Sequence, residues 1–181
     1  PWITAMTKQL VIAAVGEDRP GLADQLSKWI LDSGCNIADS RMMVLGGEFA
    51  VLLLVSGNWN SLVKLEDQLD QIQTKLGMTL SVKRTEKQQR SGAFLPYAVD
   101  VVALDHPGIV HSLANFFSQR SINIQDLSTS TYSAAHTGTL MFSVHISLDV
   151  PADTHIASLR EEFLDFCDRL NLDAVIEPLK G

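Results

Sequence analysis

Two short stretches of the sequence combine an acidic residue, a proline and a glycine between an apolar run and an amphipathic run. The first is GEDRPGLADQL at residues 16–26, and the second is ALDHPGIVHSL at residues 103–113. An aspartate beside the free N–H groups of a helix start suits a small zwitterion, because the carboxylate attracts an ammonium and the N–H groups attract a carboxylate. The pattern therefore predicts a possible site for a free amino acid.

Helix capping explains part of the same pattern without a ligand. Proline is favoured in the first turn of a helix, and an acid beside it is stabilised by the positive end of the helix dipole. Glycine early in a helix is harder to explain, since it costs up to about 1 kcal/mol relative to alanine. A ligand that closely approaches the backbone would account for Gly21 and Gly108. Both interpretations stay open at this point.

An asparagine opens the strand that is predicted after each of these helices, at Asn36 and Asn123. Its amide can both donate and accept hydrogen bonds. If this strand runs parallel to the first strand of its copy, we expect the asparagine to lie near the proline-glycine turn. Carboxylate, amide and backbone donors would then surround one small cavity.

These features belong to an internal repeat, in which Asp105 follows Asp18 by 87 residues. Identical pairs at this spacing are Val15/Val102, Asp18/Asp105, Pro20/Pro107, Gly21/Gly108, Leu26/Leu113, Asn36/Asn123, Ile37/Ile124 and Asp39/Asp126. A period of this length indicates a duplicated domain rather than a solenoid.

The first half of each copy predicts a strand, a helix and a hairpin. Apolar runs at 9–15 and 97–104 have strand length, and apolar residues at helical spacing follow each turn. Gly34 is typical of a left-handed cap at the end of the first helix. The hairpin that follows turns at Gly46 and Gly47 in the first copy and has a longer tip in the second.

The second half of each copy predicts a further helix and a closing strand. We expect Asn58 to cap this helix in the first copy, and Asp153 or Thr154 to cap it in the second. Closing strands are predicted at 79–84 and 174–178.

The resulting order, βαββαβ twice, predicts an α+β protein made of two ferredoxin-like domains, each an antiparallel sheet with its helices on one face. We expect the domains at 8–85 and 96–179, with a linker at 86–95. A one-sided layer leaves a sheet face and sheet edges exposed, which favours a homo-oligomer.

The repeated D-x-P-G-[LI] turn, followed by Asn-Ile at the start of a strand, resembles the ACT domain, a ferredoxin-like module that binds small ligands, often amino acids, between paired copies. Two ACT copies and nothing else are similar to the bacterial family of glycine cleavage system transcriptional repressors. This resemblance implies a non-enzymatic regulator that senses a small amino acid, glycine, and acts through a DNA-binding transcription factor to repress the glycine cleavage operon. The ligand-binding residues that it implies are Asp18, Gly21, Leu22, Asn36 and Ile37 in the first copy and Asp105, Gly108, Ile109, Asn123 and Ile124 in the second.

The charge of the chain argues against direct nucleic-acid binding. The net charge is −7, and residues 92–181 carry four Lys and Arg against eleven Asp and Glu. Affinity for nucleic acid comes largely from cationic side chains that displace counterions from phosphates. The longest apolar run has seven residues, at 49–55, and a bilayer span needs roughly 20, so we expect a cytoplasmic protein without membrane contact.

Two other function classes compete with the sensor. The five histidines and two cysteines do not form a metal-ligand or catalytic motif, so we expect neither a metal, a cofactor nor catalysis, and we expect Cys35 and Cys167 to be buried thiols. The alternatives that stay open are a ligand-free ACT interaction module and a regulatory subunit of an amino-acid metabolic enzyme.

Overall fold

The computed structural model describes residues 8–86 and 92–179 of the chain. The chain divides into two compact units, Pro1–Gln89 and Arg90–Gly181, here called unit 1 and unit 2. The predicted linker at 86–95 falls partly on residues 87–91, which lie outside the described residues.

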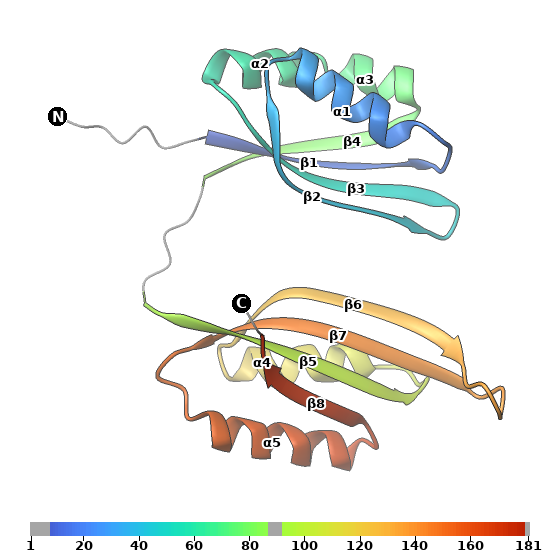
Figure 1. Cartoon of the computed structure of the whole chain (residues 1–181), viewed down its shortest axis with the longest axis vertical. Coiled ribbons are helices and arrows are strands. Elements are labelled where there is room, and N and C mark those ends of the chain that lie inside the picture. Colours follow the sequence, from blue (N-terminus) through green and yellow to red (C-terminus); the bar gives the residue numbers. More distant parts are fainter. Residues whose placement is uncertain (1–7, 87–91, 180–181) are drawn as a thin grey trace. The chain divides into compact units, whose positions relative to one another are not determined.

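Within residues 8–86, unit 1 consists of a four-stranded antiparallel sheet with helices covering one of its faces (Figure 1). Its strands pair in the order β2-β3-β1-β4. The elements follow the chain as β1 (Lys8–Glu17), α1 (Leu22–Asp32), β2 (Asn36–Leu45), β3 (Glu48–Ser56), α2 (Trp59–Asp67), α3 (Leu69–Leu76) and β4 (Met78–Glu86).

Unit 2 repeats this architecture, with its own sheet in the order β6-β7-β5-β8 and two helices on one face (Figure 1). Its elements are β5 (Phe94–Leu104), α4 (Ile109–Gln119), β6 (Asn123–Ser133), β7 (Leu140–Pro151), α5 (Ile156–Arg169) and β8 (Asp173–Pro178). The predicted ferredoxin-like α+β class is thereby confirmed.

Periodic apolar residues produce each core. In β1, Leu10, Ile12 and Ala14 alternate with more exposed residues, because successive side chains of a strand point to opposite faces. In α1, Leu22 and Leu26 lie one turn apart and are at most 2% exposed. The same pattern builds the core of unit 2 around a cluster of aromatic residues on α4 and α5.

Several predicted boundaries change in the structure. The helix predicted after Asn58 is two helices, α2 and α3, which meet at Gln68. Asn58 caps α2 as predicted, since its side chain accepts a hydrogen bond from the Ser61 N–H at 2.8 Å. The predicted cap of α5 is wrong: His155, and neither Asp153 nor Thr154, occupies this position and accepts from the backbone N–H of Ser158. An imidazole nitrogen serves here in place of the more common oxygen acceptor.

Left-handed residues end several helices. Gly34, with φ of 81°, follows α1 as predicted, and Ser121 takes the same position after α4 with φ of 56°. None of the helices within the described ranges is long and apolar enough to cross a membrane.

Both cysteines are buried and unpaired. Burial raises the pKa of the Cys167 thiol to about 12, with a smaller contribution from the nearby Asp168 carboxylate, and burial also raises the pKa of Cys35. Both side chains therefore stay protonated at neutral pH.

We expect the two thiols to react with 5,5′-dithiobis(2-nitrobenzoate) at pH 8 only as fast as the protein unfolds, because the reagent needs an accessible thiolate. Release of thionitrobenzoate, followed with and without guanidinium, measures this. Rapid reaction of either thiol in the native protein would contradict the burial.

Candidate ligand-binding site

The proline-glycine turn lies between the first strand and the first helix of each unit, which are β1 and α1 in unit 1 and β5 and α4 in unit 2. Gly21 is the N-cap of α1 with φ of 91°, and Gly108 is the N-cap of α4 with φ of 89°. The expectation that proline occupies the first turn of the helix is wrong, since both prolines precede the N-cap residue. The glycine of the turn has nearly the same φ and ψ in both copies.

The conformation of these glycines explains them without a ligand. A φ near 90° is strained for any residue with a Cβ. A Cβ at Gly21 would come no nearer than 4.0 Å to the Gln25 side chain, and one at Gly108 would meet nothing within 4 Å. The inference that a closely approaching ligand requires glycine here is therefore unsupported, because the backbone angle alone requires it.

The rest of the turn is fixed by hydrogen bonds to its own unit. The Asp18 N–H donates to the Gly47 carbonyl at 3.1 Å, and the Asp105 N–H donates to the Leu140 carbonyl at 3.2 Å. Arg19 donates to the Leu76 carbonyl at 3.1 Å. Both aspartate side chains are exposed to solvent, so they can meet a partner that is not part of their own unit.

Asn36 lies at the opposite end of the sheet from Asp18. Asn36 pairs with Ser56 of β3, which pairs with Gln9 at the start of β1, whereas Asp18 follows the other end of β1. Eight residues of strand span about 26 Å. The expectation that the turn and the asparagine of one copy surround one cavity is therefore wrong.

Unit 2 has the same separation. Asn123 pairs with Asp149, which pairs with Pro96 near the start of β5, whereas Asp105 follows its end. Leu22 and Ile109 are each 2% exposed, so their side chains belong to the cores and only their backbone can face a ligand. Ile37 and Ile124 are partly buried against the same cores.

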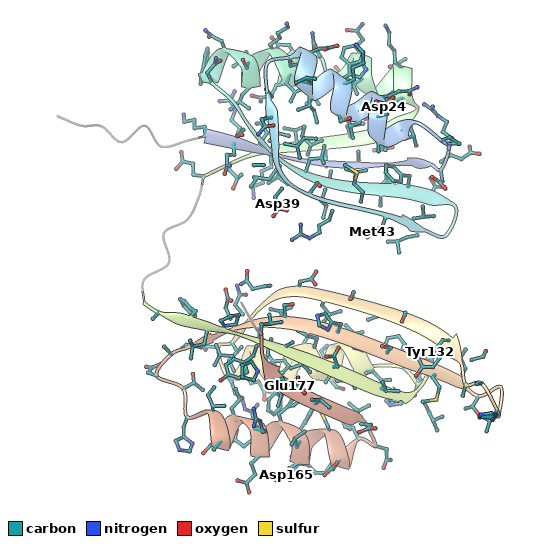
Figure 2. The ribbon with its side chains drawn as sticks, in the orientation of Figure 1. Asp24, Asp39, Met43, Tyr132, Asp165 and Glu177 are labelled. Carbon is teal, nitrogen blue, oxygen red and sulfur yellow. The ribbon has the colours of Figure 1, made fainter. Side chains whose placement is uncertain are left out.

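Asn36 and Ile37 do line a cavity, together with one face of α1. The cavity has a volume of about 350 Å³. We call it the α1–β2 groove and define it by its lining residues Asp24, Ser27, Lys28, Ile30, Leu31, Cys35, Asn36 and Ile37. Asp24 is exposed to solvent on α1 (Figure 2).

The groove carries a carboxylate at Asp24, an ammonium at Lys28 and an amide at Asn36. Lys28 also pairs with Asp32 at 2.9 Å, and this hydrogen bond raises the pKa of the ammonium, so that Lys28 is charged at neutral pH. Opposite charges and an amide in one groove are complementary to a free amino acid. Within the described residues, no cluster of three or more His, Cys, Asp or Glu has the geometry to hold a metal ion.

Sequence reasoning missed Asp24 and Lys28. The available signal was the series Asp24, Lys28 and Asp32 at four-residue spacing, which places all three on neighbouring turns of one helix. At the spacing of 87 residues, His111 and Asn115 stand where Asp24 and Lys28 stand in the first copy.

Comparison with known proteins agrees with this architecture. The ACT-domain family profile matches residues 8–83. The glycine cleavage system transcriptional repressor of Escherichia coli (strain K12) is 30% identical over 167 residues, covering 92% of this chain and 88% of the relative. The chain belongs to the glycine cleavage system transcriptional repressor family of tandem ACT proteins.

Solved structures agree with this family assignment. A crystal structure provisionally named as a glycine cleavage system transcriptional repressor matches with a TM-score of 0.72 and 30% identity, covering 98% of this chain and all of the other. An unknown protein from Galdieria sulphuraria matches with a TM-score of 0.75 at 24% identity, which supports the fold alone. As a member of the repressor family, the chain is a regulatory ACT protein.

The glycine analysis makes a prediction about stability. Gly21→Ala should lower the free energy of unfolding by about 1 kcal/mol, because alanine is strained at positive φ. Gly47→Ala is the matched control, since Gly47 is also in a turn, has no positive φ and leaves open space for a Cβ. Urea unfolding of both variants measures the difference. Equal stability of the two would show that the backbone angle is not what selects glycine at position 21.

Proposed function

We propose that this chain is a non-enzymatic transcriptional regulator that senses a small amino acid, glycine by the name of its relatives, and acts on the glycine cleavage genes through a DNA-bound protein. The observation that carries the proposal is the α1–β2 groove, whose lining combines the Asp24 carboxylate and the Lys28 ammonium with Asn36, the asparagine of the ACT pattern. In this arrangement Asp24 meets the ligand ammonium, while Lys28 and the Asn36 amide meet its carboxylate.

The sensing site is completed by a second molecule. Strand β2 lies at the edge of its sheet and carries exposed apolar side chains at its far end, with Leu45 63% exposed. Figure 2 shows Met43 pointing away from the helices on this strand. An unpaired, apolar edge is a template for another strand. We assign it to β2 of a second copy of the chain, which gives a homodimer.

Antiparallel pairing of two β2 strands also reunites the residues that one unit separates. It places the start of one strand, with Asn36, beside the end of the other, with Leu45. The chain continues there to Gly47, whose carbonyl holds the Asp18 backbone at 3.1 Å. The turn of one molecule and the asparagine of its partner then form one site, in which Asp18 adds a second carboxylate for the ammonium.

Ligand binding is coupled to regulation through the pairing itself. A site shared by two molecules is complete only when they are paired, so the ligand stabilises that arrangement. The surface that the transcription factor contacts then depends on ligand concentration, and by linkage the transcription factor alters the affinity for the ligand.

The primary test is titration calorimetry of the full chain with glycine and a panel of other amino acids. We expect saturable heat with glycine, and affinity about tenfold weaker in Asp24→Asn and Asn36→Ala, because each removes a charge-assisted hydrogen bond. The matched control is Asn60→Ala, an exposed asparagine on α2 outside the groove, which should bind like the parent chain.

The calorimetric result separates the sensor from its alternatives. Circular dichroism of each variant shows whether it is folded, so that lost binding is not confused with lost structure. If no amino acid gives heat or a shift in melting temperature, the sensor is wrong and the ligand-free interaction module is favoured. Undiminished binding in folded Asp24→Asn and Asn36→Ala would instead move the site away from this groove.

A gel-shift experiment tests the need for a partner protein. A glycine-cleavage promoter fragment should form no stable complex with this chain alone at 150 mM salt, because a net charge of −7 repels phosphates. Addition of the DNA-binding transcription factor should produce a glycine-dependent supershift. A tight, salt-sensitive complex with the chain alone would overturn the proposal that a separate protein makes the contact with DNA.

A further inference from the structure

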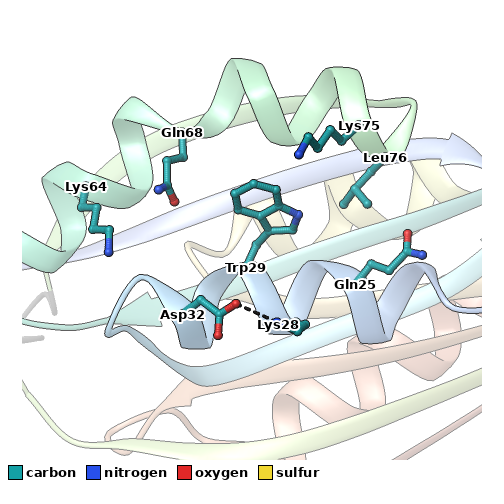
Figure 3. Close-up of a pocket in the computed structure, with 8 residues that line it drawn as sticks. All are labelled: Gln25, Lys28, Trp29, Asp32, Lys64, Gln68, Lys75 and Leu76. Carbon is teal, nitrogen blue, oxygen red and sulfur yellow. Dashed lines mark hydrogen bonds and ion pairs between the residues drawn. The ribbon is translucent and has the colours of Figure 1, made fainter.

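Unit 1 has a second cavity on its helical face, between α1 and the pair α2 and α3 (Figure 3). Its volume is about 520 Å³, within the range of roughly 300–1,000 Å³ that is typical of small-molecule sites. We call it the α1–α3 groove and define it by its lining residues Gln25, Lys28, Trp29, Asp32, Lys64, Gln68, Lys75 and Leu76. It shares only Lys28 with the α1–β2 groove.

The polar groups of this groove are mainly donors, and the one carboxylate in its lining, Asp32, is paired with a lysine. Gln25 uses its side-chain oxygen to accept from Arg19 at 3.4 Å, and Gln68 uses its own to accept from the Ser33 hydroxyl at 3.1 Å. Both glutamines therefore offer their amide N–H₂ groups to an occupant. The carboxylate of Asp32 is engaged by Lys28 at 2.9 Å. A ligand that satisfies these donors must bring its own acceptors.

The groove is also cationic and has an aromatic wall. Lys64 and Lys75 line it from α2 and α3, and both are exposed. Trp29 projects from α1 toward α3 between Gln68 and Lys75, and the Lys75 ammonium lies 5.7 Å from the centre of the indole ring (Figure 3). An indole that is only partly buried offers a flat apolar surface on which another ring can stack.

The corresponding corner of unit 2 is closed by its own side chains. Phe116, which stands 87 residues after Trp29, is 3% exposed and packs 5.2 Å from Phe163 and 5.0 Å from Phe166. Arg120 stacks on the Phe116 ring at 3.6 Å, and its counterpart in unit 1 is the small Ser33. In unit 2 aromatic rings and the Arg120 guanidinium fill this corner, whereas unit 1 has Trp29 and the small Ser33 at the equivalent positions.

We propose that the α1–α3 groove binds a small anion that carries a flat aromatic ring, either an aromatic carboxylate or a nucleoside monophosphate. The ring stacks on Trp29, the anionic group is held by Lys64 and Lys75, and the amides of Gln25 and Gln68 donate to its oxygen atoms. This site is separate from the proposed amino-acid site, because the residues that distinguish it do not line the α1–β2 groove.

The test is a two-dimensional ¹H–¹⁵N spectrum of the full chain, titrated with adenosine monophosphate and with 4-aminobenzoate. The neutral counterparts are adenosine and 4-aminobenzamide. We expect a saturable shift of the Trp29 indole N–H resonance with one of the anions, while Trp59, which does not line the groove, serves as the internal control. The two anions distinguish the phosphate source from the carboxylate source. Trp29→Phe assigns the resonance.

Charge-neutralising variants make the result specific. Lys64→Gln combined with Lys75→Gln should weaken binding of the anion at least about tenfold. Adenosine and 4-aminobenzamide should bind the parent chain as weakly as the anion binds this double variant. Lys83→Gln is the matched control, since Lys83 is exposed on β4 and does not line the groove. It should bind like the parent chain.

Two results would overturn this proposal. The first is no saturable Trp29 shift with either anion up to about 10 mM; if polyglutamate shifts Trp29 in that case, the groove is assigned to an acidic polypeptide. The second is equal affinity in the double lysine variant and in Lys83→Gln. Each is measured without glycine, so that failure here is distinguishable from failure of the amino-acid sensor.

Discussion

The first two strands of each unit run parallel, and this constraint determines where functional residues can lie. Because β3 lies between β1 and β2 and is antiparallel to both, the chain cannot join β1 to β2 through a tight turn; it leaves through the glycine turn and returns along α1. The turn therefore lies at one end of the sheet and Asn36 at the other. A ligand that touches both must be shared by two copies, which explains in physical terms why a sensor built on this fold would work as an assembly.

The sequence predicted the order of elements because periodic burial is a local property, visible in residues such as Leu10, Ile12 and Leu26. It also predicted the cap at Asn58 and the left-handed Gly34. The grouping of Asp18 with Asn36 failed, because Asp18 follows the end of β1 whereas Asn36 begins the parallel strand β2, and these points lie at opposite ends of the sheet. The placement of Asp24 and Lys28 in one groove with Asn36 depends on which face of α1 borders β2, and this is a tertiary property.

The two copies illustrate how one core pattern supports different surfaces. Residues that face the sheet correspond closely, as Leu26 and Leu113 do, because they must fill the same layer. Residues on the outer side of the first helix have no such constraint. Asp24 and Lys28 in unit 1 correspond to His111 and Asn115 in unit 2. The charged groups of the α1–β2 groove therefore lie where packing leaves the residue type free.

Helix α1 connects the features proposed as sites in unit 1. Lys28 lines both grooves, and Gln25, which lines the α1–α3 groove, accepts a hydrogen bond from Arg19 in the turn that holds Asp18. The Arg19 guanidinium also donates to the Leu76 carbonyl at the end of α3, and Leu76 lines the α1–α3 groove. One guanidinium therefore connects the turn to this groove. An occupant that accepts from the Gln25 amide would hold the side chain to which Arg19 donates, and so would bear on the turn. Two ligands that bias the same turn must affect each other's affinity reciprocally.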